Sequence, residues 1–306
     1  MSGQLRALRN RIRSVENTKK ITRAMEMVAA AKLRRFQDMM SRSRPFTDGL
    51  EKLLRRLSRP EFAGLHPFIE KREEKKTALV VITSDTGLCG SYNNDLINMA
   101  LQFIREREGR GAIHGALGRD KSRPYFIGVG KSGITAFKNA GFPCHADFTD
   151  LRASRVEEIL VELRQALEKI YISGEVDAVY VVYSHFKTLT TYKAVTEKLL
   201  PLGLGESLAV NSEDKPEKTE KYIFEPSAEA IFKKLIPFFF ESKIRTVFLE
   251  AIVSEQIARM TAMSQATKNA REMIDSLVLK RNKARQAAIT KEIIEIVSGS
   301  QALKLK

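Results

Sequence analysis

The two ends of the chain are long segments that contain neither glycine nor proline. One runs for 41 residues, from Gln4 to Arg44, and the other for 61 residues, from Phe238 to Ser298. Both exceed the usual length of a globular helix several-fold, so helices formed from them must pack on each other or on other chains. The simplest arrangement is an antiparallel coiled coil made from the two ends, with the residues between them forming a separate domain.

Apolar residues in both segments recur at steps of three and four, the spacing of one face of a helix. In the first segment, this stripe comprises Leu5, Leu8, Ile12, Val15, Ile21, Met25, Val28, Leu33, Phe36 and Met40, with an interruption at Thr18 and Lys19. In the second, it comprises Met263, Ala266, Ala270, Met273, Leu277, Lys280, Ala284 and Ala287. Sustained spacing of this kind predicts a left-handed supercoil, and the alanines allow the partner helix to approach closely. Pro45 is expected to bend the first helix rather than end it.

The last part of the second segment carries apolar residues on several sides. Residues 286–303 include Ile289, Ile293, Ile294 and Ile296. Because the second segment is the longer one, we expect its end to project beyond its partner and to be buried in something else. The alternative is that this end folds back on the middle of the chain, which a continuous helix makes awkward.

The net charge of +15 is confined to the two ends of the chain. Residues 1–60 carry +11 and residues 244–306 carry +5, whereas residues 61–243 carry −1. Such an excess predicts an anionic partner. Residues 1–35 contain no aromatic side chain to stack on bases, so an acidic protein surface is favoured over nucleic acid. The alternative, a helical arm that binds nucleic acid, would depend on Arg6, Arg9, Arg11 and Arg13.

Composition excludes several classes of protein. Two cysteines are too few for a disulfide scaffold. No run of about 18 apolar residues exists, and the first residues lack the apolar core of a secretory signal, so we expect a soluble, intracellular protein. The four histidines, which are His66, His114, His145 and His185, lack the spacing of metal ligands, and no metal site is predicted.

The middle of the chain alternates between strand-like and helix-like segments. Apolar runs of strand length occur at 77–85, 124–130 and 177–186. Helices are expected from the turn after the first run to about Arg107, from the turn after the second run through Asn139, and over 154–171. This alternation predicts an α/β fold with a mostly parallel sheet covered by helices. Two polar segments, 107–123 and 203–220, are expected to be exposed loops.

The sequence GVGKSG at 128–133 matches the glycine pattern of dinucleotide sites, between a strand and a helix. That function requires an acidic residue about twenty positions later at the end of a strand. Asp147 and Asp150 lie near that distance, yet no strand is evident before them. We therefore interpret GVGKSG as a tight strand-to-helix turn, and a nucleotide-dependent enzyme remains the alternative.

The turn SDTGLCGSYNND at 84–95 gathers Asp85, Cys89 and Asn93 at the carboxyl end of a predicted strand, where ligands bind in open α/β sheets. A thiol nucleophile needs a neighbouring base, and no histidine lies nearby in the sequence. Packing is therefore the expected role of Cys89. The residues predict no catalytic, cofactor-binding or metal-binding site.

Four long segments carry a resemblance to a known family. They are SVENTKKITRAMEMVAAAKLRRFQDMMSRSRPF at 14–46, TSDTGLCGSYN at 83–93, SEQIARMTAMSQATKNA at 254–270 and NKARQAAITKEIIEIVSGSQAL at 282–303. In this order, they resemble the gamma subunits of F-type ATP synthases over nearly the whole chain. The resemblance implies an α/β fold plus a long antiparallel coiled coil: a shaft of terminal helices, 1–60 and 226–306, and a central Rossmann-like foot domain, 61–225.

The resemblance also implies a function. Gamma is the central-stalk rotor, which transmits torque between the membrane c ring and the hexamer of alpha and beta subunits, and so couples ion flow to ATP synthesis or hydrolysis. Chemistry belongs to beta, so this chain is expected to be no enzyme by itself and to need no cofactor. The implied partners are the alpha, beta and epsilon subunits and the c ring. Nucleic acid is not among them, and the membrane is reached only through the complex. The implied location is the cytoplasmic face of a bacterial plasma membrane, or alternatively the matrix or stroma side of an organelle membrane.

Residues that match the motifs of the family are implied to contact partners. Those implied for the beta subunit are Met25, Glu255, Arg259, Arg285, Gln286, Thr290 and Glu292. Those implied for the c ring are Tyr222 and Glu225.

Overall fold

The computed structural model of the chain describes residues 2–57, 62, 64–111, 124–188, 191–203 and 225–304. It comprises two compact units. The coiled-coil unit contains residues Met1–Ala30 and Arg259–Lys306, and the α/β unit contains residues Ala31–Ala258.

Two very long helices form the ends of the chain. Helix α1 spans Ser2–Leu57 and helix α6 spans Ala228–Lys304, which is 56 and 77 residues. At a rise of 1.5 Å per residue, they measure about 84 and about 116 Å. Pro45 lies inside α1, so the prediction that it does not end the first helix is confirmed. Pro237 likewise lies inside α6, which begins before the proline-free segment does.

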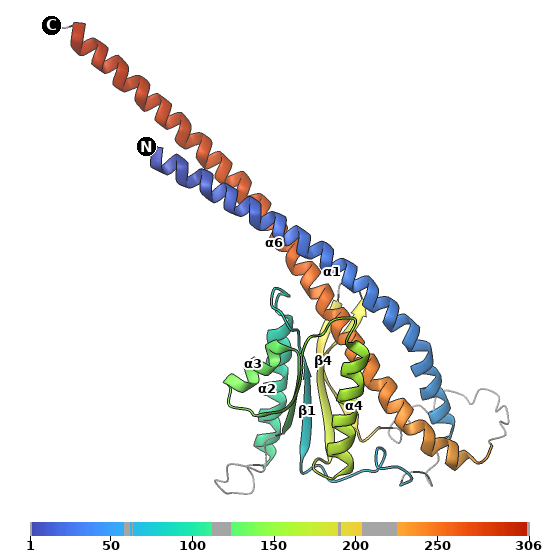
Figure 1. The fold of residues 1–306 in the computed structure, drawn as a ribbon. Coiled ribbons are helices and arrows are strands. Elements are labelled where there is room, and N and C mark those ends of the chain that lie inside the picture. Colours follow the sequence, from blue (N-terminus) through green and yellow to red (C-terminus); the bar gives the residue numbers. More distant parts are fainter. Residues whose placement is uncertain are drawn as a thin grey trace, which may run out of the picture. The chain divides into compact units, whose positions relative to one another are not determined.

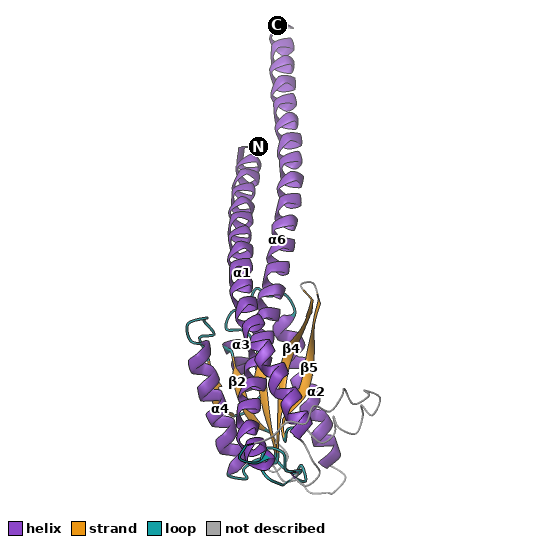
Figure 2. Cartoon of the chain, turned by 90° about the vertical axis from the view of Figure 1, so that its right-hand side faces the viewer, coloured by secondary structure: helices purple, strands orange, loops and turns teal. Residues whose placement is uncertain are grey.

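In the coiled-coil unit, α1 and α6 run side by side in opposite directions (Figures 1 and 2). The predicted pairing of the two ends of the chain is therefore confirmed. The side chains buried between the helices are Ile12, Thr22 and Ala29 of α1 and Met263, Ala270, Leu277 and Ala288 of α6. Several of them are alanines, which lets the two backbones approach closely.

The buried stripe of α1 differs from the predicted one. Ile21 and Val28 are exposed, so their assignment to the stripe is wrong. Steps of three and four continue from Val15 through Lys19 and Thr22, which are half-buried and buried. The predicted stripe followed the apolar residues on both sides of Thr18 and Lys19. A straight helix instead keeps the same face inward, whichever residues lie on that face.

The buried stripe of α6 also departs from the prediction, by one residue at three places. Met273, Lys280 and Ala287 are exposed. The residues that face inward are their neighbours Ile274, Arg281 and Ala288. A repeat of seven residues can be divided as three then four or as four then three, and the spacing of apolar residues alone does not distinguish the two.

The α/β unit is built on a five-stranded sheet in the order β3-β2-β1-β4-β5. The strands are β1 (Thr77–Ile82), β2 (Tyr125–Val129), β3 (Cys144–Phe148), β4 (Ala178–Thr188) and β5 (Thr191–Leu200). All neighbouring pairs are parallel except β4 and β5, so the predicted mostly parallel sheet is confirmed. Every residue of β1 is buried, as expected for the central strand of a sheet covered on both faces.

Three helices of the α/β unit cover the sheet. Helices α2 (Tyr92–Gly111) and α3 (Lys131–Asn139) lie on one face, and α4 (Val156–Ile172) lies on the other (Figure 1). The core between α2, α3 and the sheet includes Leu79, Leu96, Phe126 and Phe137. Because α2 continues to Gly111, the start of the predicted loop 107–123 is helical. Residues 112–123 of that loop, and all but Gly203 of the predicted loop 203–220, lie outside the described residues.

Two strands, β3 and β5, were not predicted from the sequence. Both are edge strands of the sheet. In β3, His145 and Asp147 are exposed, and β5 is mostly exposed or half-buried apart from its last two residues. Edge strands with a solvated face contain too few apolar residues to form the continuous run that identified the central strands.

Candidate partner-binding surface

The carboxyl-terminal part of α6 exposes a large amount of apolar side chain. We define the tip as residues 289–297, in which Ile289, Ile293, Ile294, Ile296 and Val297 are all exposed, Ile296 at 71%. The helix extends past the first residues of α1 (Figure 1) and is continuous to Lys304. None of these apolar side chains is buried against the described residues, so the fold-back alternative is not what the structure contains. An apolar cluster of this kind marks a surface for another molecule.

Four of the predicted contact residues flank or lie within the tip. Arg285, Gln286, Thr290 and Glu292 are all exposed. Next to them, Lys291 forms an ion pair of 3.7 Å with Glu295 along the helix. The structure therefore presents these four side chains on the same exposed stretch of α6 as the isoleucines.

Met25 lies at a different level of the coiled coil. Its side chain is half-buried, beside an ion pair of 2.9 Å between Arg23 and Glu26. Because Thr22 faces Thr267, Met25 lies near the level of Ser264 on α6. Arg285 is 21 residues further along that helix, or about 32 Å. The structure does not bring Met25 together with the residues near the tip.

An exposed apolar cluster, which the sequence did not predict, lies next to Met25. Ile21, Met27 and Val28 are each more than half exposed on α1. The predicted buried stripe contains Ile21 and Val28 but not Met27. Strict continuation of the steps from Val15 through Lys19 and Thr22 would have placed Ile21 and Val28 on the outer face.

Glu255 and Arg259, which the resemblance assigns to the beta contact, are buried inside the chain, with 6% and 8% exposure. Both side chains have interaction partners within the chain. Glu225 is exposed, and Tyr222 lies outside the described residues. Among the predicted contact residues that the structure describes, Glu225 and the four near the tip are exposed, Met25 is half-buried, and Glu255 and Arg259 are buried.

The GVGKSG turn between β2 and α3 is closed by the side chain and backbone of Thr83. Gly130 has a φ of +88°, and a Cβ atom there would lie 2.2 Å from the carbonyl oxygen of Thr83. The hydroxyl of Thr83 donates to the carbonyl of Val129 at 3.0 Å and accepts from the N–H of Gly133 at 2.9 Å. The interpretation of this segment as a tight strand-to-helix turn is confirmed.

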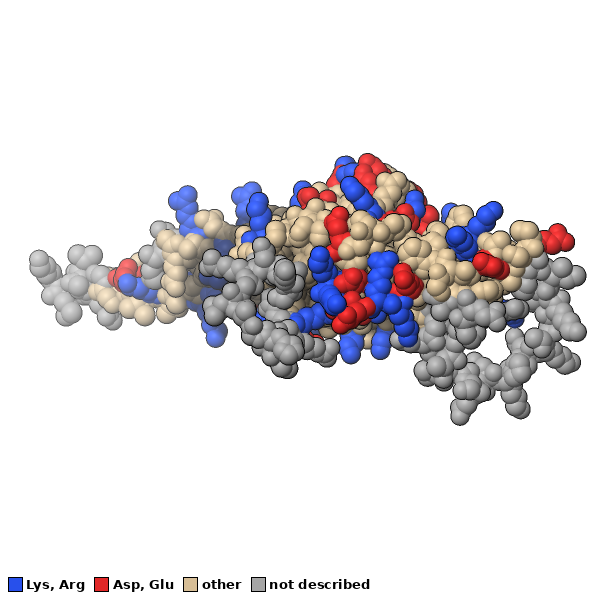
Figure 3. Space-filling view, turned by 90° about the horizontal axis from the view of Figure 1, so that it is seen from below, with Lys and Arg blue, Asp and Glu red and all other residues tan. Residues whose placement is uncertain are grey.

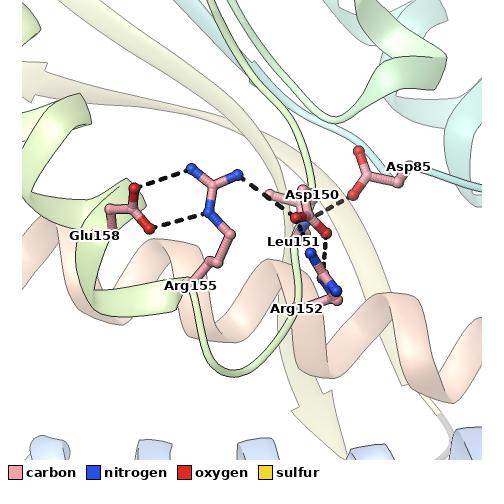
Figure 4. A network of polar contacts seen from close by, with 6 residues as sticks. All are labelled: Asp85, Asp150, Leu151, Arg152, Arg155 and Glu158. Carbon is pink, nitrogen blue, oxygen red and sulfur yellow. Dashed lines mark hydrogen bonds and ion pairs between the residues drawn. The ribbon is translucent and has the colours of Figure 1, made fainter.

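Asp85 occupies the amino-terminal end of α3 (Figure 4). Its carboxylate accepts hydrogen bonds from the backbone N–H of Lys131 at 3.2 Å and of Leu151 at 2.6 Å. A helix amino terminus favours negative charge, and here a side chain of the same chain supplies it. A strand, β3, does contain Asp147 and precede Asp150, contrary to the sequence prediction. The place that a phosphate takes in dinucleotide-binding folds is thus filled by Asp85.

Asp150, in the loop between β3 and α4, pairs with two arginines that precede the first residue of α4 (Figure 4). Arg152 forms two hydrogen bonds with its carboxylate, and Arg155 lies 3.6 Å away and also donates to Glu158. The hydrogen bonds from Arg152 are the main reason that the pKa of Asp150 lies below its ordinary value. These contacts order the loop between β3 and α4.

Charged side chains of the α/β unit are largely paired with one another. Arg245 of α6 forms two hydrogen bonds of 2.6 Å with Glu157 of α4. Glu74 contacts both Arg107 and Lys198. Acidic and basic side chains are interleaved on the face of the molecule seen in Figure 3. This pairing agrees with the near-zero net charge of the middle of the sequence.

The remaining candidate chemical groups have structural partners. Cys89 is buried and accepts a hydrogen bond from the amide of Asn93 at 3.3 Å, in keeping with the predicted packing role. His145 stacks on Tyr125, and His185 contacts Glu250. Within the described residues, no group of three or more His, Cys, Asp and Glu side chains is arranged to hold a metal ion. No described helix is long and apolar enough to cross a membrane.

The fold therefore defines a class of chain in which a Rossmann-like domain is inserted between the two helices of an antiparallel coiled coil. The sequence profile of a family described as ATP synthase matches residues 4–303. A protein of Desulforamulus reducens named ATP synthase gamma chain is 41% identical over 303 residues, which cover 98% of this chain and 99% of that one. The chain belongs to the family of ATP synthase gamma chains.

Solved structures show the same fold. A chain in the central stalk/c-ring structure of the Tetrahymena thermophila mitochondrial ATP synthase matches 80% of this chain and 99% of its own length, with a TM-score of 0.54 and 25% identity. A chain in the Euglena gracilis mitochondrial ATP synthase matches 99% of this chain and 95% of its own length, with a TM-score of 0.64 and 16% identity.

Proposed function

We propose that this chain is the rotating central-stalk subunit of an ATP synthase. In this function, it transmits torque between the membrane c ring and the catalytic hexamer of alpha and beta subunits, and so couples ion flow to ATP synthesis or hydrolysis. Membership of the gamma chain family supports this proposal, and the Tetrahymena relative comes from a structure titled central stalk/c-ring.

The single observation that carries the proposal is the exposed, isoleucine-rich tip on an unbroken helix of 77 residues. Exposed apolar surface of this size is unfavourable in water, so it is retained where a partner covers it. A sleeve of apolar residues in the hexamer is the partner that fits a single projecting helix. The basic excess at both ends of the chain fits acidic surfaces of the beta subunits, because complementary charge guides and registers such contacts.

The contact residues follow from this placement. Arg285, Gln286, Thr290 and Glu292 contact a loop of beta near the tip, and Met25 contacts beta at a lower level of the shaft. Glu255 and Arg259 are assigned to the same coupling region, and their burial means that they act by holding the position of α6 from inside the chain. Tyr222 and Glu225 are assigned to the contact with the c ring.

Further features of the proposal concern chemistry, partners, organisation and place. We assign catalysis to the beta subunits of the complex, so that this chain takes part without chemistry of its own. Its partners are alpha, beta, epsilon and the c ring, and it has functional segments 1–60, 61–225 and 226–306. Its relatives in bacteria favour a peripheral position on the cytoplasmic face of the plasma membrane over an organelle membrane.

Two variants test the proposal in ATP synthase complexes assembled with this chain. The first lacks residues 286–306, and the second carries Met25→Lys, with Met25→Leu as its matched control. We expect the truncated chain and Met25→Lys to lower the charge moved across the membrane per ATP hydrolysed. Nucleotide binding at the beta sites should be kept in both, and Met25→Leu should behave as wild type. Unchanged coupling in both variants would contradict the proposal.

A further inference from the structure

Glu250 of α6 and His185 of β4 form a contact inside the α/β unit. Nδ1 of His185 lies 2.7 Å from a carboxylate oxygen of Glu250. The Glu250 residue is only 6% exposed, whereas the side chain of His185 is 40% exposed. A buried carboxylate is costly unless it is paired, so this contact is the main compensation for placing a charge in the packed face of α6.

Two further hydrogen bonds join the same turn of α6 to the domain. The hydroxyl of Ser254 donates to the carbonyl of Ser184 at 3.0 Å, and the hydroxyl of Tyr92 donates to the carbonyl of Ala251 at 2.9 Å. Neither bond involves a group that carries a charge near neutral pH, because the hydroxyls of serine and tyrosine are both uncharged there. The His185–Glu250 contact is the member of this set of three that can respond to pH.

Other charged groups face this contact from the neighbouring elements. The positive charge of Arg44 on α1 favours the ionised form of Glu250. On β5, Lys193 is the residue paired with His185 in the sheet register. Glu197 of β5 repels Glu250, but it is itself bound by the hydroxyl of Tyr183 and by Lys243, each at 2.9 Å. Burial raises the pKa of Glu250, and His185 and Arg44 oppose that rise.

We propose that His185 is a positioning residue that holds α6 against the sheet through Glu250, and that protonation of His185 strengthens this hold. The inference rests on the proposed function for its consequence. If torque passes between the α/β domain and the long helix, the contacts made by residues 250–254 of α6 are among those that it crosses, together with others such as that of Arg245 with Glu157.

The direction of the pH effect follows from the charges. When the imidazole is protonated, a cation faces the carboxylate in a poorly hydrated site, and the attraction is strong. When the imidazole is neutral, the ring keeps its hydrogen bond but no longer brings a charge to the contact. Because burial raises the pKa of Glu250, its contribution to stability is present at low pH and is lost as pH rises. The attraction itself needs both an ionised Glu250 and a protonated His185, so toward alkaline pH it is loss of the imidazole proton that weakens the hold.

A titration of the full chain tests the contact directly. The imidazole of His185 is followed by NMR with labelled histidine in the wild type, in Glu250→Gln and in the matched control Lys187→Gln, which changes an exposed residue of the same strand. We expect Glu250→Gln to move the midpoint of His185 to lower pH, because the carboxylate stabilises the imidazolium. Lys187→Gln should leave the midpoint near that of the wild type. An unchanged midpoint in Glu250→Gln would overturn the proposal.

A second measurement tests the consequence in the assembled complex. Charge movement per ATP hydrolysed is recorded in membrane vesicles with a potential-sensitive dye between about pH 6 and about pH 8.5, across the histidine range. We expect this ratio to fall with rising pH in the wild type and in Lys187→Gln, and to lose that dependence in His185→Gln. His185→Asn repeats the test if His185→Gln does not assemble.

The outcomes separate two failures. A wild-type chain that supports no ATP-driven charge movement contradicts the proposed function itself. A functional wild type whose pH profile is shared by both His185 variants leaves the proposed function standing and overturns only the role of His185.

Discussion

The hydroxyl oxygens of Thr22 on α1 and Thr267 on α6 lie 2.8 Å apart, across the seam of the coiled coil. Each hydroxyl is also within hydrogen-bond distance of a carbonyl of its own helix, Lys19 at 3.1 Å and Met263 at 2.8 Å. In the α/β unit, the same two helices are bridged by the hydroxyls of Thr47 and Ser242, which are 25 positions later on α1 and 25 earlier on α6. Paired polar groups at a buried seam specify the axial register of two helices, which the small alanines around them do not.

Replacing Thr22 by valine should lower the free energy of unfolding by about 1 kcal/mol, because the hydrogen bond to Thr267 is lost while the volume is kept. The loss is modest since Thr267 retains the carbonyl of Met263. Urea unfolding followed by helical circular dichroism measures the effect. Thr22→Ser keeps the hydroxyl and serves as the control. A double variant, Thr22→Val with Thr267→Val, that costs the full sum of the two single variants would show that the hydroxyls do not interact.

Gly130→Ala should destabilise the α/β unit by at least about 3 kcal/mol. The new Cβ would lie 2.2 Å from the carbonyl oxygen of Thr83, in addition to the strain of a positive φ. Gly141→Ala is a matched control, because Gly141 also has a positive φ, of +80°, but no atom lies within 4 Å of its added Cβ. Its cost should be about 1 kcal/mol. Thermal unfolding of the two variants measures the two losses of stability. Equal losses in Gly130→Ala and Gly141→Ala would contradict the predicted crowding at Thr83.

Glu74→Gln should destabilise the α/β unit at pH 7 by about 2 kcal/mol, and by much less near pH 2. Burial by itself would raise the pKa of Glu74, but hydrogen bonds from Lys198, Arg107 and Tyr180 lower it to about 2. A carboxylate with a lowered pKa stabilises the fold above its unfolded value, near 4.3, and loses that contribution as pH falls toward the folded value.

The measurement for Glu74 is the free energy of unfolding of wild type and Glu74→Gln across the acid range. Glu73→Gln is the control on the neighbouring residue, whose ion pair with Lys75 is highly exposed and therefore worth little. A difference between wild type and Glu74→Gln that stays constant from pH 7 to about pH 2 would show that the ionised form of Glu74 is not what stabilises the fold.

The isolated chain should not bind NAD or ATP at the GVGKSG turn. Thr83 fills the space beside Gly130 and Gly133, and the carboxylate of Asp85 takes the backbone N–H of Lys131 that a phosphate would need. Calorimetric titration of the chain with each nucleotide checks this expectation. Binding of one nucleotide per chain, weakened by a substitution at Ser132 in the same turn, would instead support the nucleotide-dependent alternative.

Much of the fold follows from local sequence patterns. The segments without glycine or proline indicated both long helices, and the continuous apolar runs identified β1, β2 and β4. These patterns are strong because a buried central strand or a paired helix needs apolar side chains at fixed intervals. The edge strands β3 and β5 were missed because their solvated faces tolerate polar residues such as His145 and Asp147.

The candidate surface was less predictable, for a related reason. The surface near the tip could be predicted because its isoleucines lie on several sides of the helix, and one partner helix can bury only one side. Ile21 and Val28 were wrongly assigned to the buried stripe, because residue type alone does not distinguish an apolar side chain at the surface from one between the two helices. Glu255 and Arg259 belong to a conspicuous motif, but nothing in the motif states that the chain buries them.

Composition and spacing along the chain are enough to predict the two long helical ends, the mostly parallel α/β middle and the basic excess at both ends. Packing in three dimensions sets which face of each helix is buried, which hydroxyls fix the register, and that Asp85 fills the turn after β2. Those features depend on contacts between residues as far apart as Thr22 and Thr267, and the energy of such a contact is set by distance in space rather than by position in the sequence.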